Sequence, residues 1–147
     1  MYKRILVPLD NSPTDGPIVA HVLDLARHCG ASILLIHVAD GFAARNLEQL
    51  ELKESEEIRK DRAYLDETAA RISATGLQVD ALLAGGDPTE EIVAAAIREK
   101  CDLIAMGTHG HRFLKDVFFG SVANEVRHQS LVPVLLVRGN PDDRPAK

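Results

Sequence analysis

The chain has 147 residues, 46% of them hydrophobic and 27% charged, which is typical of a single globular domain. Seventeen Lys and Arg residues against 22 Asp and Glu residues leave a formal net charge of −5, and no apolar run is long enough to span a membrane. We therefore expect neither nucleic acid nor a membrane as a partner. Cys29 and Cys101 lack the spacing of a metal or redox motif, which fits free thiols in a reducing cytoplasm.

The first part of the chain predicts two strands with a helix between them. The apolar runs Ile5–Leu9 and Ile33–Val38 are continuous rather than alternating, as in strands that are buried on both faces. The intervening helix ends before Gly30, because glycine readily adopts the left-handed conformation of a helix cap. The residues expected on its apolar face are Ile18, Val22 and Ala26.

A longer helix is predicted over Asn46–Ser73, followed by a third strand over Val79–Leu83. The charged stretch at the start of this helix is interpreted as a solvated face. Glu56 and Lys60 lie four residues apart, and such a pair stabilises a helix by a few tenths of a kcal/mol.

The third helix has the clearest start signal in the sequence. Asp87 is the expected N-cap, Pro88 the first helical residue, and Glu90 completes a capping box. A fourth strand is predicted over Leu103–Met106. The residues of the third helix expected to face the core are Ile92, Val93, Ala96 and Ile97.

A fourth helix is expected to begin near Ser121, and a last strand to cover Val134–Val137. Strand and helix thus alternate throughout, which predicts an α/β fold: an open, doubly wound, Rossmann-like parallel sheet with helices on both faces. Residues 1–138 are expected to form one domain, with 139–147 as a flexible tail. The inward residues expected in the fourth helix are Val122, Ala123 and Val126.

The candidate binding residues follow the strands at their carboxyl ends, where parallel sheets of this class bind ligands. Asp10 follows the first strand, and a G-x2-G-x9-G-S pattern runs from Gly107 to Ser121 after the fourth. Glycine lets the backbone approach a ligand closely, and a helix start after Gly120 would offer free N–H groups to a phosphate. The alternative is that these residues only form a turn and cap a helix.

The segments Ile5–Ser12, Gly86–Ile92 and Met106–Val122 make the chain resemble the universal stress protein family in its single-domain form. That resemblance implies a five-stranded sheet of order 3-2-1-4-5, with a ligand crevice between strands one and four. In this family the glycine pattern marks members that bind ATP. Two positions depart from the family, since Asn11 stands where glycine is frequent and His111 where arginine is frequent.

The resemblance implies a nucleotide-binding role for ten residues of this chain. Three would border the adenosine, one would pack on the adenine, three would line the ribose and phosphates, and three would hold the phosphates. In that order they are Pro8, Leu9 and Asp10; Val38; Met106, Gly107 and Gly110; and Gly120, Ser121 and Val122.

We therefore expect an adenine-nucleotide-binding regulator or sensor of the stress response that acts on a protein partner. The ligand is expected to be ATP, with AMP and ADP as options, and Mg²⁺ could accompany ATP. No general base and no metal-ligand set is evident, so we expect slow hydrolysis or none and assign no catalytic or metal residues. Two alternatives stay open: an interaction protein without a nucleotide, and a phosphotransfer or phosphatase enzyme that uses Asp10.

A homodimer is also expected. Leu131–Val137 is the most apolar segment of the chain, and the strand order places it at an open edge of the sheet. Pairing of two such edges about a twofold axis would cover both. The alternative is a monomer whose edge is covered by its own tail or by a helix.

Gly120→Asp tests the phosphate assignment. It places a negative charge where phosphates are expected, so ATP affinity should fall steeply while the thermal midpoint of unfolding stays the same. Calorimetric titration and thermal melting measure the two quantities. Retained ATP affinity with an unchanged midpoint would show that the assignment is wrong.

Overall fold

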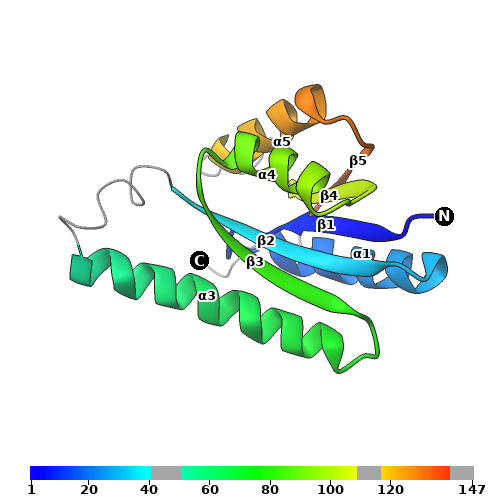
Figure 1. Ribbon diagram of the computed structural model, residues 1–147, viewed down its shortest axis with the longest axis horizontal. Helices are drawn as coiled ribbons and strands as arrows, with labels where there is room; N and C mark the ends of the chain where they lie inside the picture. The colour runs from blue at the N-terminus through cyan, green and yellow to red at the C-terminus, as the bar shows by residue number, and fades with distance from the viewer. Residues whose placement is uncertain (41–50, 109–116, 140–147) are drawn as a thin grey trace.

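The computed structural model describes residues 1–40, 51–108 and 117–139 and contains the expected five strands and four helices (Figure 1). The strands are β1 Arg4–Pro8, β2 Ser32–Asp40, β3 Val79–Gly86, β4 Leu103–Thr108 and β5 Val134–Arg138. The helices are α1 Asp15–Cys29, α3 Glu51–Ser73, α4 Pro88–Arg98 and α5 Val117–Gln129.

The strands form one parallel sheet in the order β3-β2-β1-β4-β5, which confirms the expected fold class and strand order. α1 and α3 cover one face of this sheet, and α4 and α5 cover the other (Figure 1). Each face therefore has its own buried apolar cluster. β1 alternates between the two, because Ile5 and Val7 face α1 and α3 whereas Leu6 belongs to the opposite cluster.

The helix ends confirm the two predicted caps. Gly30 has a φ of 67°, in the left-handed region, and its N–H donates to the carbonyl of Ala26. The carboxylate of Asp87 accepts a hydrogen bond of 3.0 Å from the backbone N–H of Glu90. Local sequence signals are reliable here because each satisfies a backbone group that the helix end leaves without a partner.

One predicted core residue is placed wrongly. Ile97 of α4 is 58% exposed, whereas Ala95 is fully buried. Residues that share the face of Ile92 lie three and four positions further along a helix, and Ile97 lies five further, so it turns toward solvent. In α5 the expected inward residues Val122, Ala123 and Val126 are buried.

Helix α5 is described from Val117 and already contains Ser121, so the expected start near Ser121 is wrong. A single glycine costs only about 1 kcal/mol inside a helix, so Gly120 does not have to mark a helix boundary. The residues before Val117 lie outside the described ones.

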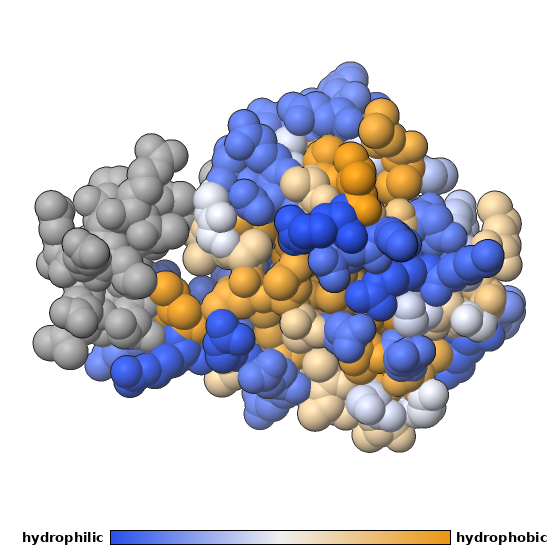
Figure 2. Space-filling model, viewed as in Figure 1, coloured by the Kyte–Doolittle hydropathy of each residue, from blue (hydrophilic) through white to orange (hydrophobic). Residues whose placement is uncertain are grey.

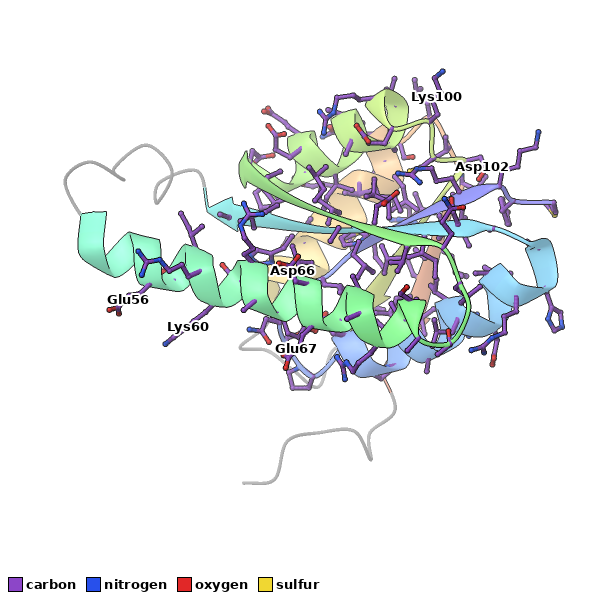
Figure 3. The ribbon with its side chains drawn as sticks, turned by 60° about the horizontal axis from the view of Figure 1, so that its bottom comes forward. Glu56, Lys60, Asp66, Glu67, Lys100 and Asp102 are labelled. Carbon is purple, nitrogen blue, oxygen red and sulfur yellow. The ribbon has the colours of Figure 1, made fainter. Side chains whose placement is uncertain are left out.

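The long helix α3 is described from Glu51, and its expected start at Asn46 lies outside the described residues. Its charged side is solvated as predicted, since Glu56 and Lys60 point away from the sheet (Figure 3). Figure 2 shows apolar surface between the two helical layers, where the edge strand β3 lies in Figure 1. Within the described ranges, no helix is both long and apolar enough to cross a bilayer.

Candidate functional site

The candidate site is built on the three residues that follow β1, the central strand. β1 pairs with β2 on one side and with β4 on the other, so the chain connections leave it in opposite directions at this point. The backbone N–H of Leu9 donates to the carbonyl of Ile36 at 2.8 Å and continues the sheet. Leu9, Asp10 and Asn11 therefore begin at a rigid strand and end at the edge where a ligand crevice is expected.

The carboxylate of Asp15 fixes the next two residues. It accepts hydrogen bonds from the N–H of Asp10 at 3.3 Å and from the N–H of Asn11 at 2.8 Å. Asn11 has a φ of 59°, the left-handed conformation that asparagine tolerates better than most side chains. Asparagine therefore adopts the backbone conformation at a position where the family frequently has glycine.

His37 of β2 fixes the carbonyl side of the same segment. Its Nδ1 lies 2.8 Å from the carbonyl oxygen of Leu9, and its Nε2 lies 3.1 Å from a carboxylate oxygen of Asp61 in α3. Both side chains are mostly buried, with 14% and 17% exposed. The ring is therefore held from both sides, by the backbone after β1 and by α3.

Asp15 carries the most perturbed carboxyl group of the site. It is only 4% exposed, and Tyr64 of α3 donates a hydrogen bond to it. Burial, together with repulsion from the carboxylate of Asp10, raises the pKa of Asp15 to about 6, although its hydrogen bonds act in the opposite direction. Burial, together with the Asp15 carboxylate, raises the pKa of Tyr64, so the Tyr64 hydroxyl stays protonated and donates.

One buried acceptor of the site has no partner. Oδ1 of Asp10 is shielded from solvent and accepts no hydrogen bond in the described part of the chain. Buried polar atoms are nearly always hydrogen-bonded, and an orphan of this kind costs about 1–3 kcal/mol or more. This oxygen can therefore accept a hydrogen bond from a group outside the described residues.

The other residues predicted to contact the nucleoside are buried or half-buried. Pro8, Leu9 and Met106 are buried, and Val38 is half-buried against the cluster on the α4 and α5 face. A Cβ on Gly107 would lie 3.0 Å from the carbonyl oxygen of Thr14, so glycine is needed there for the packing of α1 on β4. Direct contact of these residues with a ligand stays a prediction.

The phosphate-side residues are described only in part. Gly110, His111 and the rest of 109–116 lie outside the described residues, as does the expected tail over 140–147. Gly120 and Ser121 lie in the first two turns of α5, with Ser121 exposed and Val122 buried. Their contact with phosphates also stays a prediction.

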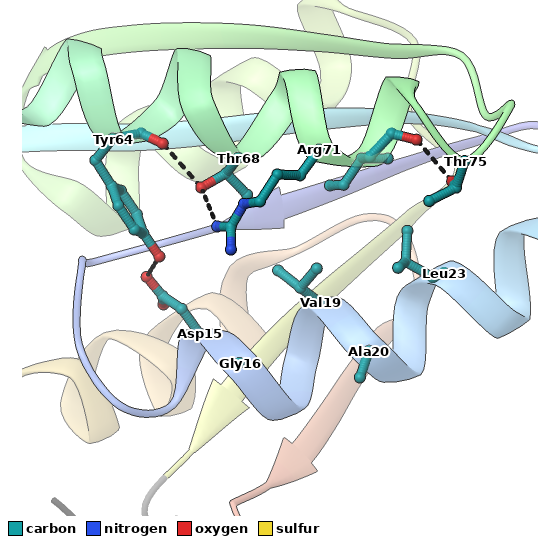
Figure 4. A pocket seen from close by; sticks show the side chains of 10 residues that line it. Asp15, Gly16, Val19, Ala20, Leu23, Tyr64, Thr68, Arg71 and Thr75 are labelled. Carbon is teal, nitrogen blue, oxygen red and sulfur yellow. Dashed lines mark hydrogen bonds between the residues drawn. The ribbon is translucent and has the colours of Figure 1, made fainter.

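A pocket of about 360 Å³ lies between α1 and α3 (Figure 4). Asp15 and Tyr64 are at one end, Arg71 and Thr68 line the α3 side, and the remaining wall is mostly apolar. Sequence analysis predicted neither this pocket nor the pairing of Asp15 with Tyr64. The two residues are 49 positions apart, and no local pattern connects them.

The pKa of Asp15 predicts how stability depends on pH. Because the folded-state pKa lies above the ordinary 3.8, the native protein binds more protons than the unfolded chain, and stability falls as pH rises through about 6. Asp15→Asn removes this titration. The unfolding free energy of the variant relative to wild type should therefore rise by about 2 kcal/mol between about pH 4.5 and pH 7.

Urea denaturation at the two pH values measures the difference. Asp66→Asn, the same change at an exposed carboxylate of α3, is the matched control and should follow wild type at both pH values. A constant difference between wild type and Asp15→Asn would contradict the raised pKa.

Comparison with known proteins places this fold in a family. The model of the universal stress protein family matches residues 1–138. Universal stress protein MJ0577 of Methanocaldococcus jannaschii is 30% identical over 94% of this chain and 96% of its own length. A universal stress protein of Thermus aquaticus is 36% identical over 94% of this chain and all of its own.

Solved structures agree. MJ0577 has a TM-score of 0.80 with 31% identity over 95% of this chain and 98% of its own. A universal stress protein in complex with cAMP (TM-score 0.70, 22% identity, 93% and 97% coverage) has the same fold. A universal stress protein from Archaeoglobus fulgidus in complex with dAMP also has this fold, with a TM-score of 0.69 and 20% identity over 92% of this chain and 98% of its own. The match over 138 residues, together with the sheet order, shows that this chain belongs to the universal stress protein family.

Proposed function

We propose that this chain binds an adenine nucleotide, preferentially ATP, at the carboxyl ends of β1, β2 and β4, and acts as a regulator or sensor in the stress response. The observation that carries this proposal is the buried, unpaired Oδ1 of Asp10. Hydroxyl or amine groups of an adenosine would supply the missing donor. The complexes of two proteins of this fold with cAMP and dAMP support the same class of ligand, because both ligands contain an adenine and a sugar.

The residues present fit such a nucleotide. Asp10 would accept from the adenosine, and the half-buried Val38 offers an apolar contact for the flat face of the base. The positive end of the α5 dipole, at its N-terminus, favours the negative phosphates. When bound, ATP would bring its own phosphates and an accompanying Mg²⁺ to this end of the sheet.

Slow hydrolysis or none follows from the two titratable side chains next to Asp10. A general base must be free to take a proton from water. Asp15 already accepts three hydrogen bonds, and His37 is held between Leu9 and Asp61. Both serve as structural acceptors or donors, which favours a binding protein over an enzyme.

The first experiment asks what the purified protein carries. Denaturation followed by chromatography of the supernatant should release an adenine nucleotide, and calorimetry should show heat of binding for added ATP. A protein that releases nothing and binds no ATP would be an interaction protein without a nucleotide. Turnover of ATP at 1 to 10³ per second, the range of typical enzymes, would indicate an enzyme instead.

Asp10→Ala tests the assigned contact. Loss of a hydrogen bond to a charged group costs about 1.5–3 kcal/mol, so adenosine affinity should fall by roughly tenfold to a hundredfold. The thermal midpoint of the ligand-free protein should not fall, because the substitution also removes a buried atom without a partner. Asp24→Ala, at an exposed carboxylate of α1, is the control. Unchanged adenosine affinity in Asp10→Ala would contradict the assignment.

We also propose a homodimer through the edge strand β5. Leu131, in the turn before the strand, is 83% exposed, and Leu136 within it is 39% exposed. Within the described residues β5 pairs with β4 alone, which makes it an edge strand that a second copy could extend. A self-complementary pairing about a twofold axis would bury Leu136 of both chains.

Leu136→Lys should convert a dimer of about twice 16.0 kDa into a soluble monomer. Val134 packs against the core, so Leu136 alone is the better position to change. Ile97→Lys, at an exposed leucine-sized side chain of α4, should leave the mass unchanged. Light scattering at micromolar concentration measures both. A wild-type mass of one chain at every concentration would rule the dimer out.

A further inference from the structure

Helix α3 directs a row of polar side chains toward the end of β1. Asp61, Tyr64, Thr68 and Arg71 are spaced by three and four residues, which places them on one side of a helix. Thr68 donates to the carbonyl of Tyr64 at 2.8 Å, and Arg71 donates to the hydroxyl of Thr68 at 3.2 Å (Figure 4). Hydrogen bonds thus connect Tyr64, Thr68 and Arg71 to one another, and the hydroxyl of Tyr64 points at Asp15.

This row holds the residues next to Asp10 in two ways. Asp61 contacts His37, which bonds the carbonyl of Leu9. Tyr64 bonds Asp15, which bonds the N–H groups of Asp10 and Asn11. The backbone on both sides of Asp10 thus depends on side chains that α3 supports, while the carboxylate of Asp10 itself is left with an unpaired oxygen.

We propose that Asp15, supported by Tyr64, is a positioning residue that fixes Asp10 for the adenosine when ionised and releases it when protonated. This inference rests on the proposed function, because it assumes that Asp10 contacts the ligand. Asp15 touches the backbone of the site and not the ligand, and its effect passes through the conformation of Asp10 and Asn11.

The physical reason is the number of acceptors. An ionised carboxylate accepts from all three donors at once, and such charge-assisted bonds are roughly twice as strong as neutral ones. Protonation removes the charge and turns one oxygen into a donor that faces other donors. Asn11, which is held in the left-handed region, is then free to relax toward more common conformations.

Protonation of Asp15 occurs in an accessible pH range, because burial raises the pKa of its carboxyl group to about 6. The ionisable groups around it are the carboxyl of Asp10, Tyr64 on α3, and Arg71, which lines the same pocket. His37, with its partner Asp61, acts on the Leu9 carbonyl and is a separate titratable group. A comparison of wild type with Asp15→Asn isolates the contribution of Asp15.

The binding experiment uses adenosine, because phosphate groups titrate near pH 6 themselves. Calorimetric titration at a series of pH values from 5 to 7.5 should show that wild-type affinity rises about fivefold, the equivalent of about 1 kcal/mol in one hydrogen bond. The profile should be flat in Asp15→Asn and should keep the wild-type slope in Asp66→Asn. Tyr64→Phe, which retains the ring, should lower affinity at pH 7.5 toward the acid value.

A second readout needs no ligand. The chain has two tyrosines and no tryptophan, so Tyr2→Phe leaves Tyr64 as the only tyrosine. Its ultraviolet absorbance and fluorescence in the free protein should change with a midpoint near pH 6 as its acceptor ionises. Addition of Asp15→Asn to this background should abolish the transition.

The outcomes separate the inference from the proposed function. Adenosine binding with the same pH profile in wild type and Asp15→Asn would overturn the inference and leave the proposed function standing, as would a tyrosine transition that has no effect on affinity. Absence of adenosine binding at every pH would overturn both. If Asp15→Asn does not fold, Tyr64→Phe decides: unchanged affinity at pH 7.5 would overturn the inference.

Discussion

A parallel sheet that is covered by helices on both faces determines where this protein can bind anything. Every strand ends at the same edge, and the central strand β1 has neighbours whose connections lie on opposite faces. In sheets of this class ligands bind beside the central strand, where the strand order reverses. Asp10 stands at this place because it is the second residue after β1.

The segment after β1 shows how a binding group is prepared in advance. The sheet, Asp15 and His37 hold the backbone from Leu9 to Asn11, and one acceptor oxygen of Asp10 stays without a partner. A buried acceptor of this kind lowers stability, and so does the ionised form of the buried Asp15. Departures of this kind from maximal stability are expected at functional sites.

Helix α3 has two different sides. Glu56, Lys60 and Asp66 meet solvent. Leu65, Thr68 and Ile72, by contrast, are buried. Asp61 and Tyr64 lie on the same helix and reach the residues that flank Asp10. The charged composition of α3 suggests only a solvated surface helix. The helix nevertheless supports the candidate site, from the face of the sheet that α4 and α5 do not cover.

Local sequence patterns were sufficient for the elements and for their caps. The continuous apolar runs predicted all five strands, and Gly30 and Asp87 ended or began helices as expected, because each signal acts within a few residues. The strand order and the ten candidate nucleotide residues came from the family resemblance. The position of Asp10 at the carboxyl end of the first strand could be predicted from the sequence, because Asp10 directly follows an apolar run.

Tertiary structure alone decided the remaining features. Asp15 and Tyr64 are 49 residues apart in the chain, and only the folded structure brings them into contact. In the same way, His37 of β2 contacts Asp61 of α3. Sequence periodicity describes one element at a time. Burial of a carboxylate, and hence its pKa and its hydrogen-bond partners, depends on which elements fold against each other.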